Sequence, residues 1–247
     1  MKLSLNANDD LPVFRQVAQA LHRKIMSGEL QPGQRMPAET ALASENGIHR
    51  SSVREAIRSL EQQGLLHREE GKRKLFVSTP STATLSRKLV TPMIMEGVTF
   101  EEIWETIRAL DPVVAEAAAQ RRDAANLRAL EDNLERTRAA RGDIDELVRL
   151  DIEFHELIAL AANNRVIQAL RLPISDLFYP SFQTVMISLN AEERLLTAHE
   201  RILQAIKWGE ADEARDWMIR HLNDFRKGYE LASLDIRGPA ALQASEA

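Results

Sequence analysis

The chain has 247 residues, no cysteine and a net charge of −5, and 44% of its residues are hydrophobic. This length allows two domains with separate cores, and the composition is typical of a soluble globular protein. Without cysteine there are no disulfides and no thiolate chemistry, and no apolar run approaches the roughly 18 residues that a membrane span requires. We therefore expect a cytoplasmic protein with no membrane partner.

The first part of the chain predicts three helices in close succession. Apolar residues at three- and four-residue steps predict a helix from Val13 to Ser27. Residues 38–45 form a second helix, which the turn-forming pair Asn46-Gly47 follows. Ser52 and Glu55 have the spacing of a capping box, so we expect the third helix to begin near Ser52.

The third helix has two chemically different faces. Arg54 and Arg58, four residues apart, project away from its apolar face, and Arg50 and Ser51 stand just before it. Such a leading end suits the DNA major groove, where arginine can bond guanine or phosphate and hydroxyls can bond phosphate. An ordinary amphipathic helical hairpin with solvated arginines is the alternative on spacing alone.

A short β-hairpin is predicted after the helices. Leu65–Arg68 and Lys74–Val77 are strand-like, and a charged turn with Gly71, Lys72 and Arg73 joins them. Helices followed by a hairpin with a basic tip predict a winged helix-turn-helix, in which the tip lies beside the phosphate backbone or the minor groove. A solvated basic turn is the alternative for the tip.

Several motifs of this region resemble the winged-helix domain of GntR-type bacterial regulators. They are Gly28–Glu39, Arg50–Ala56 and Leu60–Leu65, and the resemblance extends over about residues 11–78. It implies that operator DNA is contacted by Arg50, Ser51, Ser52, Arg54 and Gly71. Two departures are Thr40, where the family usually has an arginine, and a wing that lacks the usual second glycine and aromatic residue.

The remainder of the chain predicts an all-α domain. Residues 79–84 are small and polar and serve as a linker between a DNA-binding domain at 1–78 and a second domain at 85–232, before a flexible tail at 233–247. The charge balance is +3 over residues 1–80, with 12 Lys+Arg and 9 Asp+Glu, and −8 over the rest, with 20 and 28. The basic excess is therefore confined to the expected DNA-binding part.

The second domain is predicted to be a bundle of about six to seven helices, so the fold class is mostly α. The expected helices are 84–95, 100–121, 123–141, 144–162, 164–188, 191–208 and 210–231. Three pairs with capping-box spacing indicate helix starts: Thr99 with Glu102, Asp143 with Glu146, and Asn190 with Glu193. Prolines at positions 112, 173 and 180 should kink or interrupt the longer helices.

Three histidines and an aspartate of this bundle point to a metal site. Asp151 and His155 are four residues apart and leave the same helix face, whereas His199 and His221 lie in the apolar stripes of two later helices. Imidazole and carboxylate groups suit a divalent transition metal, with zinc expected first and nickel or manganese behind it. Histidines that are merely hydrogen-bonded core residues are the alternative.

The motifs around these histidines resemble the FadR-type C-terminal ligand-binding (FCD) domain over about residues 85–230. They are Phe154–Ile158, His199–Ile206 and Met218–Leu222. The resemblance implies four metal ligands, Asp151, His155, His199 and His221. It also implies a small carboxylate or sugar-acid effector bound at the metal and paired with Arg108. Asp111 stands where the family usually has a glutamate, and Pro112 follows it.

The sequence therefore predicts a ligand-responsive transcriptional regulator, and we expect a repressor that effector binding releases from a palindromic operator. A homodimer would present two recognition helices to such a site. The alternative is a metal-dependent hydrolase or lyase-type enzyme built on the bundle, with an appended DNA-binding module. Glu156 is the only adjacent general-base candidate and turns about 100° away from His155, so we expect no enzyme.

Overall fold

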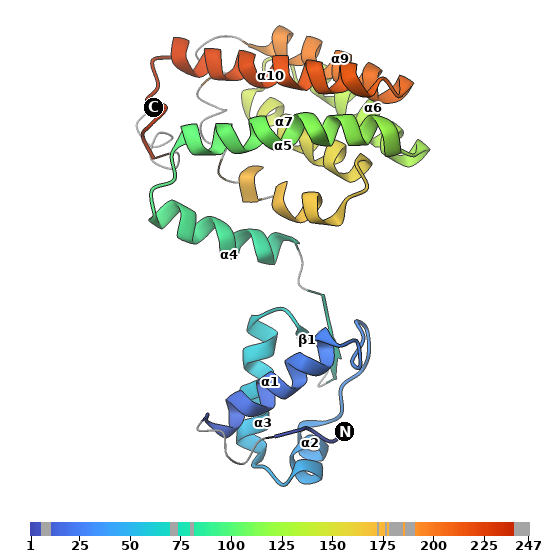
Figure 1. The fold of residues 1–247 in the computed structure, drawn as a ribbon, viewed down its shortest axis with the longest axis vertical. Helices are drawn as coiled ribbons and strands as arrows, with labels where there is room; N and C mark the ends of the chain where they lie inside the picture. Colours follow the sequence, from blue (N-terminus) through green and yellow to red (C-terminus); the bar gives the residue numbers. More distant parts are fainter. Residues whose placement is uncertain are drawn as a thin grey trace. The chain divides into compact units, whose positions relative to one another are not determined.

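The structure is a computed structural model that describes residues 1–5, 11–69, 74–79, 82–171, 173–175, 177, 185 and 191–239. It divides into two compact units, residues 1–84 and 85–247, each with its own apolar core (Figure 1). Helices dominate both units and the described residues include one two-stranded sheet, which confirms the predicted fold class.

The first unit contains three helices and the two strands. Their bounds are α1 Val13–Met26, α2 Glu39–Asn46, α3 Arg50–Gln62, β1 Leu66–Arg68 and β2 Leu75–Val77. The apolar faces of α1 and α3 meet in the core, where Val17, Leu21 and Ile57 are fully buried. β1 and β2 pair antiparallel, with Leu66 opposite Val77.

The predicted turn between α2 and α3 is present, but the predicted capping box is wrong. Gly47 adopts a left-handed conformation with φ of 66° and ends α2. α3 then begins at Arg50, because the carbonyl of His49 already accepts the backbone N–H groups of Ser52 and Val53. His49 is the N-cap and makes no side-chain capping bond, so Arg50 lies in the first turn of the helix.

In the second unit, α5, α6, α7, α9 and α10 pack into a helical bundle, and α4 precedes them in the chain (Figure 1). The helix bounds are α4 Thr82–Met95, α5 Phe100–Arg121, α6 Ala124–Ala139, α7 Ile144–Ala161, α9 Glu192–Trp208 and α10 Ala211–Leu231. α5 packs against α7, α9 and α10, and α9 also contacts α6 and α10. Within the described residues, no helix is long and apolar enough to cross a membrane.

Most predicted helix ends agree with the structure to within two residues. α5 begins behind a complete capping box of Thr99 and Glu102, and Pro112 lies within the helix without interrupting it. α4 begins at Thr82, inside the stretch expected to be a linker. Asn190 and Pro180 lie outside the described residues.

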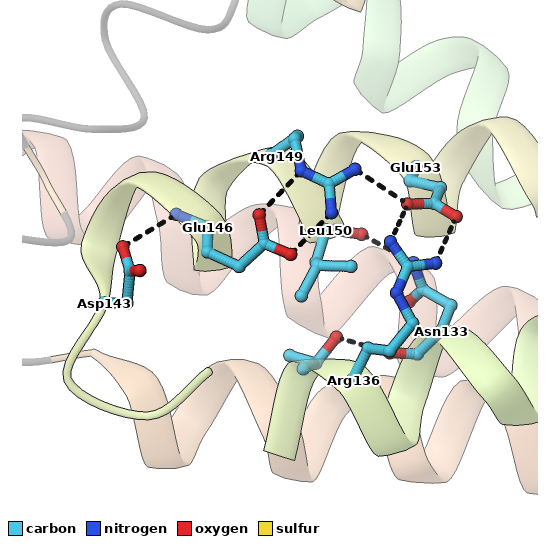
Figure 2. Close-up of polar contacts among 8 residues, drawn as sticks. Asn133, Arg136, Asp143, Glu146, Arg149, Leu150 and Glu153 are labelled. Carbon is cyan, nitrogen blue, oxygen red and sulfur yellow. Dashed lines mark hydrogen bonds and ion pairs between the residues drawn. The ribbon is translucent and has the colours of Figure 1, made fainter. Parts of the chain in front are cut away.

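Polar contacts between α6 and α7 fix the rotation of α7 (Figure 2). The buried amide of Asn133 donates to the carbonyl of Leu150 at 3.1 Å, and Arg136 binds both carboxylate oxygens of Glu153 at 2.8 Å. The Asp143 side chain accepts the Glu146 N–H at 3.1 Å, as predicted for a helix start. With α7 in this rotation, Asp151 and His155 are buried in the core.

Candidate metal centre and candidate nucleic-acid interface

A cationic groove of about 530 Å³ lies on the first unit. Its lining includes six cationic side chains and two carboxylates: Arg35, Arg50, Arg54, Arg58, Arg68 and Lys74, with Glu39 and Glu61. Thr40, the position where an arginine is usual, also lines it. An excess of positive charge in a groove is what attraction to nucleic-acid phosphates requires.

The charges of this groove differ in whether they are already paired. Glu39 contacts Arg50 at 3.7 Å and Arg68 at 3.0 Å, and Glu61 contacts Arg68 at 3.0 Å. Arg54 and Arg58 are exposed and form no ion pair within the part of the chain that the structure describes. α3 therefore presents two uncompensated guanidinium groups.

The structure describes two of the other predicted DNA contacts, Ser51 and Ser52. Ser51 is exposed and Ser52 half-buried at the start of α3. Gly71, Lys72 and Arg73 lie outside the described residues. Sequence reasoning missed Arg35 and Arg68 as groove residues, because neither is on the recognition helix and only the tertiary fold brings them to it.

In the second unit, Asp151, His155, His199 and His221 lie together. Each offers one ligand atom, and these four atoms lie within 4.8 Å of one another. The Nε2 atoms of His155 and His221 are 3.2 Å apart, and Asp151 Oδ1 is 3.1 Å from His199 Nε2 and 3.7 Å from His221 Nε2. α7 contributes Asp151 and His155, α9 contributes His199, and α10 contributes His221.

The cluster is enclosed by the core of the bundle. His199 is fully buried and stacks on Phe154 with ring centroids 3.9 Å apart. Asp151 and His155 are also buried, and His221 is 9% exposed. Four polar groups at this depth are costly unless they bind each other or an ion.

Burial and mutual contacts shift the pKa values of the metal-free cluster. Burial alone would raise the pKa of Asp151, but the hydrogen bond from His199 and the neighbouring histidine charges lower it to about 2. Burial, together with the charges of His199 and His155, lowers the pKa of His221 to about 3. Burial also lowers the pKa of His199, against the attraction of Asp151.

The donor set fits a divalent transition metal. Bonds of about 2.0–2.2 Å hold the ligand atoms of such an ion roughly 3–4 Å apart, and the separations given above have that scale. The set also contains one anionic and three neutral donors of the types that zinc, nickel and manganese accept. The structure brings these four residues together at one point of the bundle.

A second buried pair lies behind His155. Asp111 of α5 is 3.3 Å from His155 Nδ1 through Oδ2 and 3.2 Å from Arg171 Nε through Oδ1. Asp111 and Arg171 are both buried, and Arg171 donates to the Ser175 hydroxyl at 2.7 Å. Burial would raise the pKa of Asp111, but Arg171 and His155 lower it below its usual value. No local sequence pattern predicts a role for Arg171, because its contact with Asp111 joins residues that are 60 positions apart in the sequence.

Arg108, the predicted effector contact, lies one turn before Asp111 on α5. It is half-buried and makes no ion pair with any residue in the described ranges. Pro112 has no N–H, so the helical bond that the Arg108 carbonyl would otherwise accept is missing.

A cavity of about 250 Å³ reaches His221 from outside the bundle. Arg194 and Asp224 line it and form an ion pair at 3.1 Å, and Arg220 at its edge stacks on Trp217, 4.9 Å from the ring centroid. The cavity is large enough for a small organic molecule, and its lining holds two arginines, Arg194 and Arg220, and two carboxylates, Glu193 and Asp224.

We expect the metal-free protein to lose stability as the pH falls from 7 to 5. The unfolded histidines titrate near 6.5, whereas burial holds the folded pKa of His221 at about 3 and lowers that of His199. The unfolded state then binds more protons, so the free energy of unfolding falls below pH 6.5, by up to about 1.4 kcal/mol per pH unit and histidine. Asp151 adds a further loss only below about pH 4.

Urea unfolding with chelator present would measure this pH dependence. All three tryptophans, Trp104, Trp208 and Trp217, lie in the second unit, so their fluorescence reports on its unfolding alone. A His199→Leu variant should show a shallower dependence. A free energy of unfolding that is constant or rises from pH 7 to pH 5 would contradict the prediction.

Comparisons with known proteins give two family matches. The sequence pattern described as "Bacterial regulatory proteins, gntR family" matches residues 14–75, and that of the FCD domain matches residues 102–224. A solved structure, Streptococcus agalactiae GntR, is similar with a TM-score of 0.65 and 27% identity, covering 87% of this chain and 99% of that one.

Three relatives match most of the chain. The HTH-type transcriptional regulator LutR of Bacillus subtilis is 29% identical over 83% of this chain and 97% of its own length. The uncharacterized HTH-type transcriptional regulator YdhC of the same organism is 30% identical, with coverage of 86% and 88%. The galactonate operon transcriptional repressor of Escherichia coli is 25% identical, with coverage of 86% and 92%.

Proposed function

Because the chain belongs to the GntR family of bacterial regulatory proteins and carries an FCD domain, we propose that it is a repressor that a small acid releases from operator DNA. It is a transcriptional regulator and not an enzyme, so the hydrolase or lyase alternative is set aside. We further propose which residues contact DNA, that the second unit binds a metal and an acid, and that the protein acts as a dimer. The expected compartment is the cytoplasm, where bacterial operator DNA lies.

The proposed DNA contacts are made by α3 and the groove beside it. Arg54 carries a guanidinium on the exposed face that has no ion-pair partner among the described residues, and Arg50 and Ser51 occupy the first turn, where backbone N–H groups also face outward. These groups can bond guanine edges and phosphate oxygens. Ser52, and Gly71, Lys72 and Arg73 of the wing, remain predicted contacts.

The proposed effector site is the buried cluster of the second unit. The observation that carries it is the convergence of one carboxylate and three imidazoles from three helices, within 4.8 Å of one another. Asp151, His155, His199 and His221 would hold the metal, with zinc first and nickel or manganese next. A divalent ion bound there would offer a coordination position to a carboxylate oxygen.

The proposed effector is a small carboxylate or sugar acid. The 250 Å³ cavity at the edge of His221 has room for such a molecule. Arg194 in its lining is paired with Asp224, so Arg220, which forms no ion pair within the described residues, is the cationic group proposed to meet the acid. Arg108 remains a predicted contact, since a guanidinium can bind a carboxylate through two hydrogen bonds. The relative from E. coli is named for a galactonate operon, and galactonate is an acid of this class.

The active form is proposed to be a homodimer that reads a palindromic site. Apolar side chains of the second unit support this proposal. Leu89 and Met93 of α4 are exposed and line an apolar groove of about 790 Å³ with Leu110, Leu170 and Ile174. A second copy would cover such a surface.

Release of DNA would follow from a difference in affinity between two states. An acid that binds the cluster more tightly in one arrangement of the dimer shifts the population toward that arrangement. If this arrangement misplaces the two α3 helices for the operator, repression ends. The four cluster residues lie on α7, α9 and α10, which pack against other helices of the bundle. An acid bound at the cluster would therefore affect how these helices pack.

Operator binding in the presence of acids tests this function. We expect one member of a panel containing galactonate, lactate and acetate to weaken operator binding at least tenfold, measured by fluorescence anisotropy on a duplex selected from a random pool. Chelator should abolish the effect of the acid. Equal operator affinity with every acid, or an acid effect that persists in chelator, would contradict the proposed mechanism.

A further inference from the structure

Asp111 lies outside the proposed metal ligands but contacts one of them. Its two oxygens are divided between His155 Nδ1 at 3.3 Å and Arg171 Nε at 3.2 Å, and all three residues are buried. None of these four polar atoms has a well-aligned hydrogen bond within the described residues. Buried charged and polar atoms this close interact electrostatically even where their hydrogen-bond alignment is imperfect.

The Asp111 contact determines which nitrogen of His155 carries a proton. A carboxylate is only an acceptor, so the facing Nδ1 must be the N–H nitrogen and Nε2 keeps its lone pair. Nε2 is the His155 atom that lies 3.2 Å from His221 Nε2, inside the cluster. His155 is therefore in the tautomer that a metal at the cluster requires.

Arg171 determines the orientation and charge of Asp111 in turn. Its guanidinium can only donate, and it is held in place by the Ser175 hydroxyl at 2.7 Å. We propose that Asp111 and Arg171 are positioning residues of the metal centre, in which Asp111 fixes the His155 tautomer and Arg171 fixes Asp111. This inference rests on the proposed metal function and assigns roles to two residues that lie outside the ligand set.

The competing explanation is a structural ion pair that joins α5 to the residues around Arg171. Both explanations predict that removal of Asp111 destabilises the fold, because it leaves a buried arginine unpaired. They differ in the effect on the His155 tautomer and on metal affinity per folded molecule. The experiment must therefore measure these two properties rather than stability alone.

Asp111→Asn separates the two explanations. Arg171 still requires an acceptor, so it should draw the amide oxygen of the new side chain and turn the NH₂ group toward His155. Nδ1 must then accept, and the proton moves to Nε2, where it opposes metal binding. We expect a 10- to 100-fold loss of zinc affinity, as is typical when an outer-shell partner of a ligating histidine is lost.

A second substitution should reverse part of this loss. In the double variant Asp111→Asn with Arg171→Met, the amide is free to turn its oxygen toward His155, so zinc affinity should recover at least fivefold relative to Asp111→Asn. Asp111→Glu, which retains the carboxylate, should bind zinc within about threefold of the wild type, and if Asp111→Asn does not fold, the tautomer of His155 in the wild type decides between the two explanations. Glu116→Gln, which breaks the 3.7 Å ion pair with Arg215 between α5 and α10, is the matched control and should not change zinc affinity.

Two measurements give the outcome. Competition against a chromophoric chelator measures zinc affinity below the melting transition, and ¹⁵N NMR of histidine-labelled, metal-free protein reports whether His155 carries its proton on Nδ1 or Nε2. Unchanged zinc affinity in Asp111→Asn, no recovery in the double variant, or an Nε2–H tautomer in the wild type would each overturn the proposal. If the wild type binds no zinc, nickel or manganese, the proposed metal function fails instead.

Discussion

Arg54→Ala should abolish most specific operator binding without unfolding the protein. Arg54 is exposed at the start of α3, faces the cationic groove and has no ion-pair partner in the residues that the structure describes. A good arginine contact to a base is worth about 1–3 kcal/mol, and the proposed twofold dimer would lose two of them, about 2–6 kcal/mol in all. Operator affinity should therefore fall roughly 30-fold or more.

The salt dependence of binding tells which contact was lost. If Arg54 binds a base, the variant should keep its affinity for random DNA and the slope of log affinity against log salt. If it binds phosphate, affinity should fall for all sequences and the slope should decrease by about one per arginine. Arg15→Ala, an exposed arginine of α1 outside the groove, is the control. Equal operator affinity of Arg54→Ala and the wild type would refute the assigned role of α3.

His199→Ala should uncouple the stability of the second unit from metal. Binding to the folded state alone adds about 4 kcal/mol when the free ion is at a thousand times its dissociation constant. For a unit of this size that corresponds to roughly 8–16 °C in melting temperature. The wild type should therefore melt at a much lower temperature in chelator, whereas the variant should melt at one temperature with and without chelator.

His22→Ala is the matched control for His199→Ala. His22 is exposed on α1 of the first unit, so its loss should leave the effect of chelator intact. The variant at His199 should also be destabilised in the absence of metal, because it leaves a cavity beside Phe154 and removes the partner of Asp151. A wild-type melting temperature that is the same with and without chelator would show that the cluster is structural.

Local patterns predicted the helices well where the signal itself is local. α5 runs from Phe100 to Arg121 as expected, because its start depends on a capping box within four residues and its length on an unbroken apolar period. The start of α3 was misplaced because the cap uses the backbone carbonyl of His49, which leaves no trace in side-chain type.

The residues of the candidate site also differ in whether a local sequence pattern predicts them. The spacing of Asp151 and His155, and the positions of His199 and His221 in apolar stripes, are enough to predict these four side chains as metal ligands from the sequence. Asp111 and Arg171 could not be paired from the sequence, since their contact depends on how α5 packs against a segment 60 residues away. Periodicity gives the buried face of each helix but not the partner that this face meets.

The depth of the cluster has a kinetic consequence. His199 is fully buried and Asp151 nearly so, whereas His221 is 9% exposed, so an ion held by the four residues would exchange through the His221 edge and only after its bonds to the buried ligands break. Exchange would then be slower than at a surface site of equal affinity. Chelators and competing metals should therefore act over a long incubation rather than on mixing, and the ion recovered after a rapid purification would record which metal was available while the chain folded.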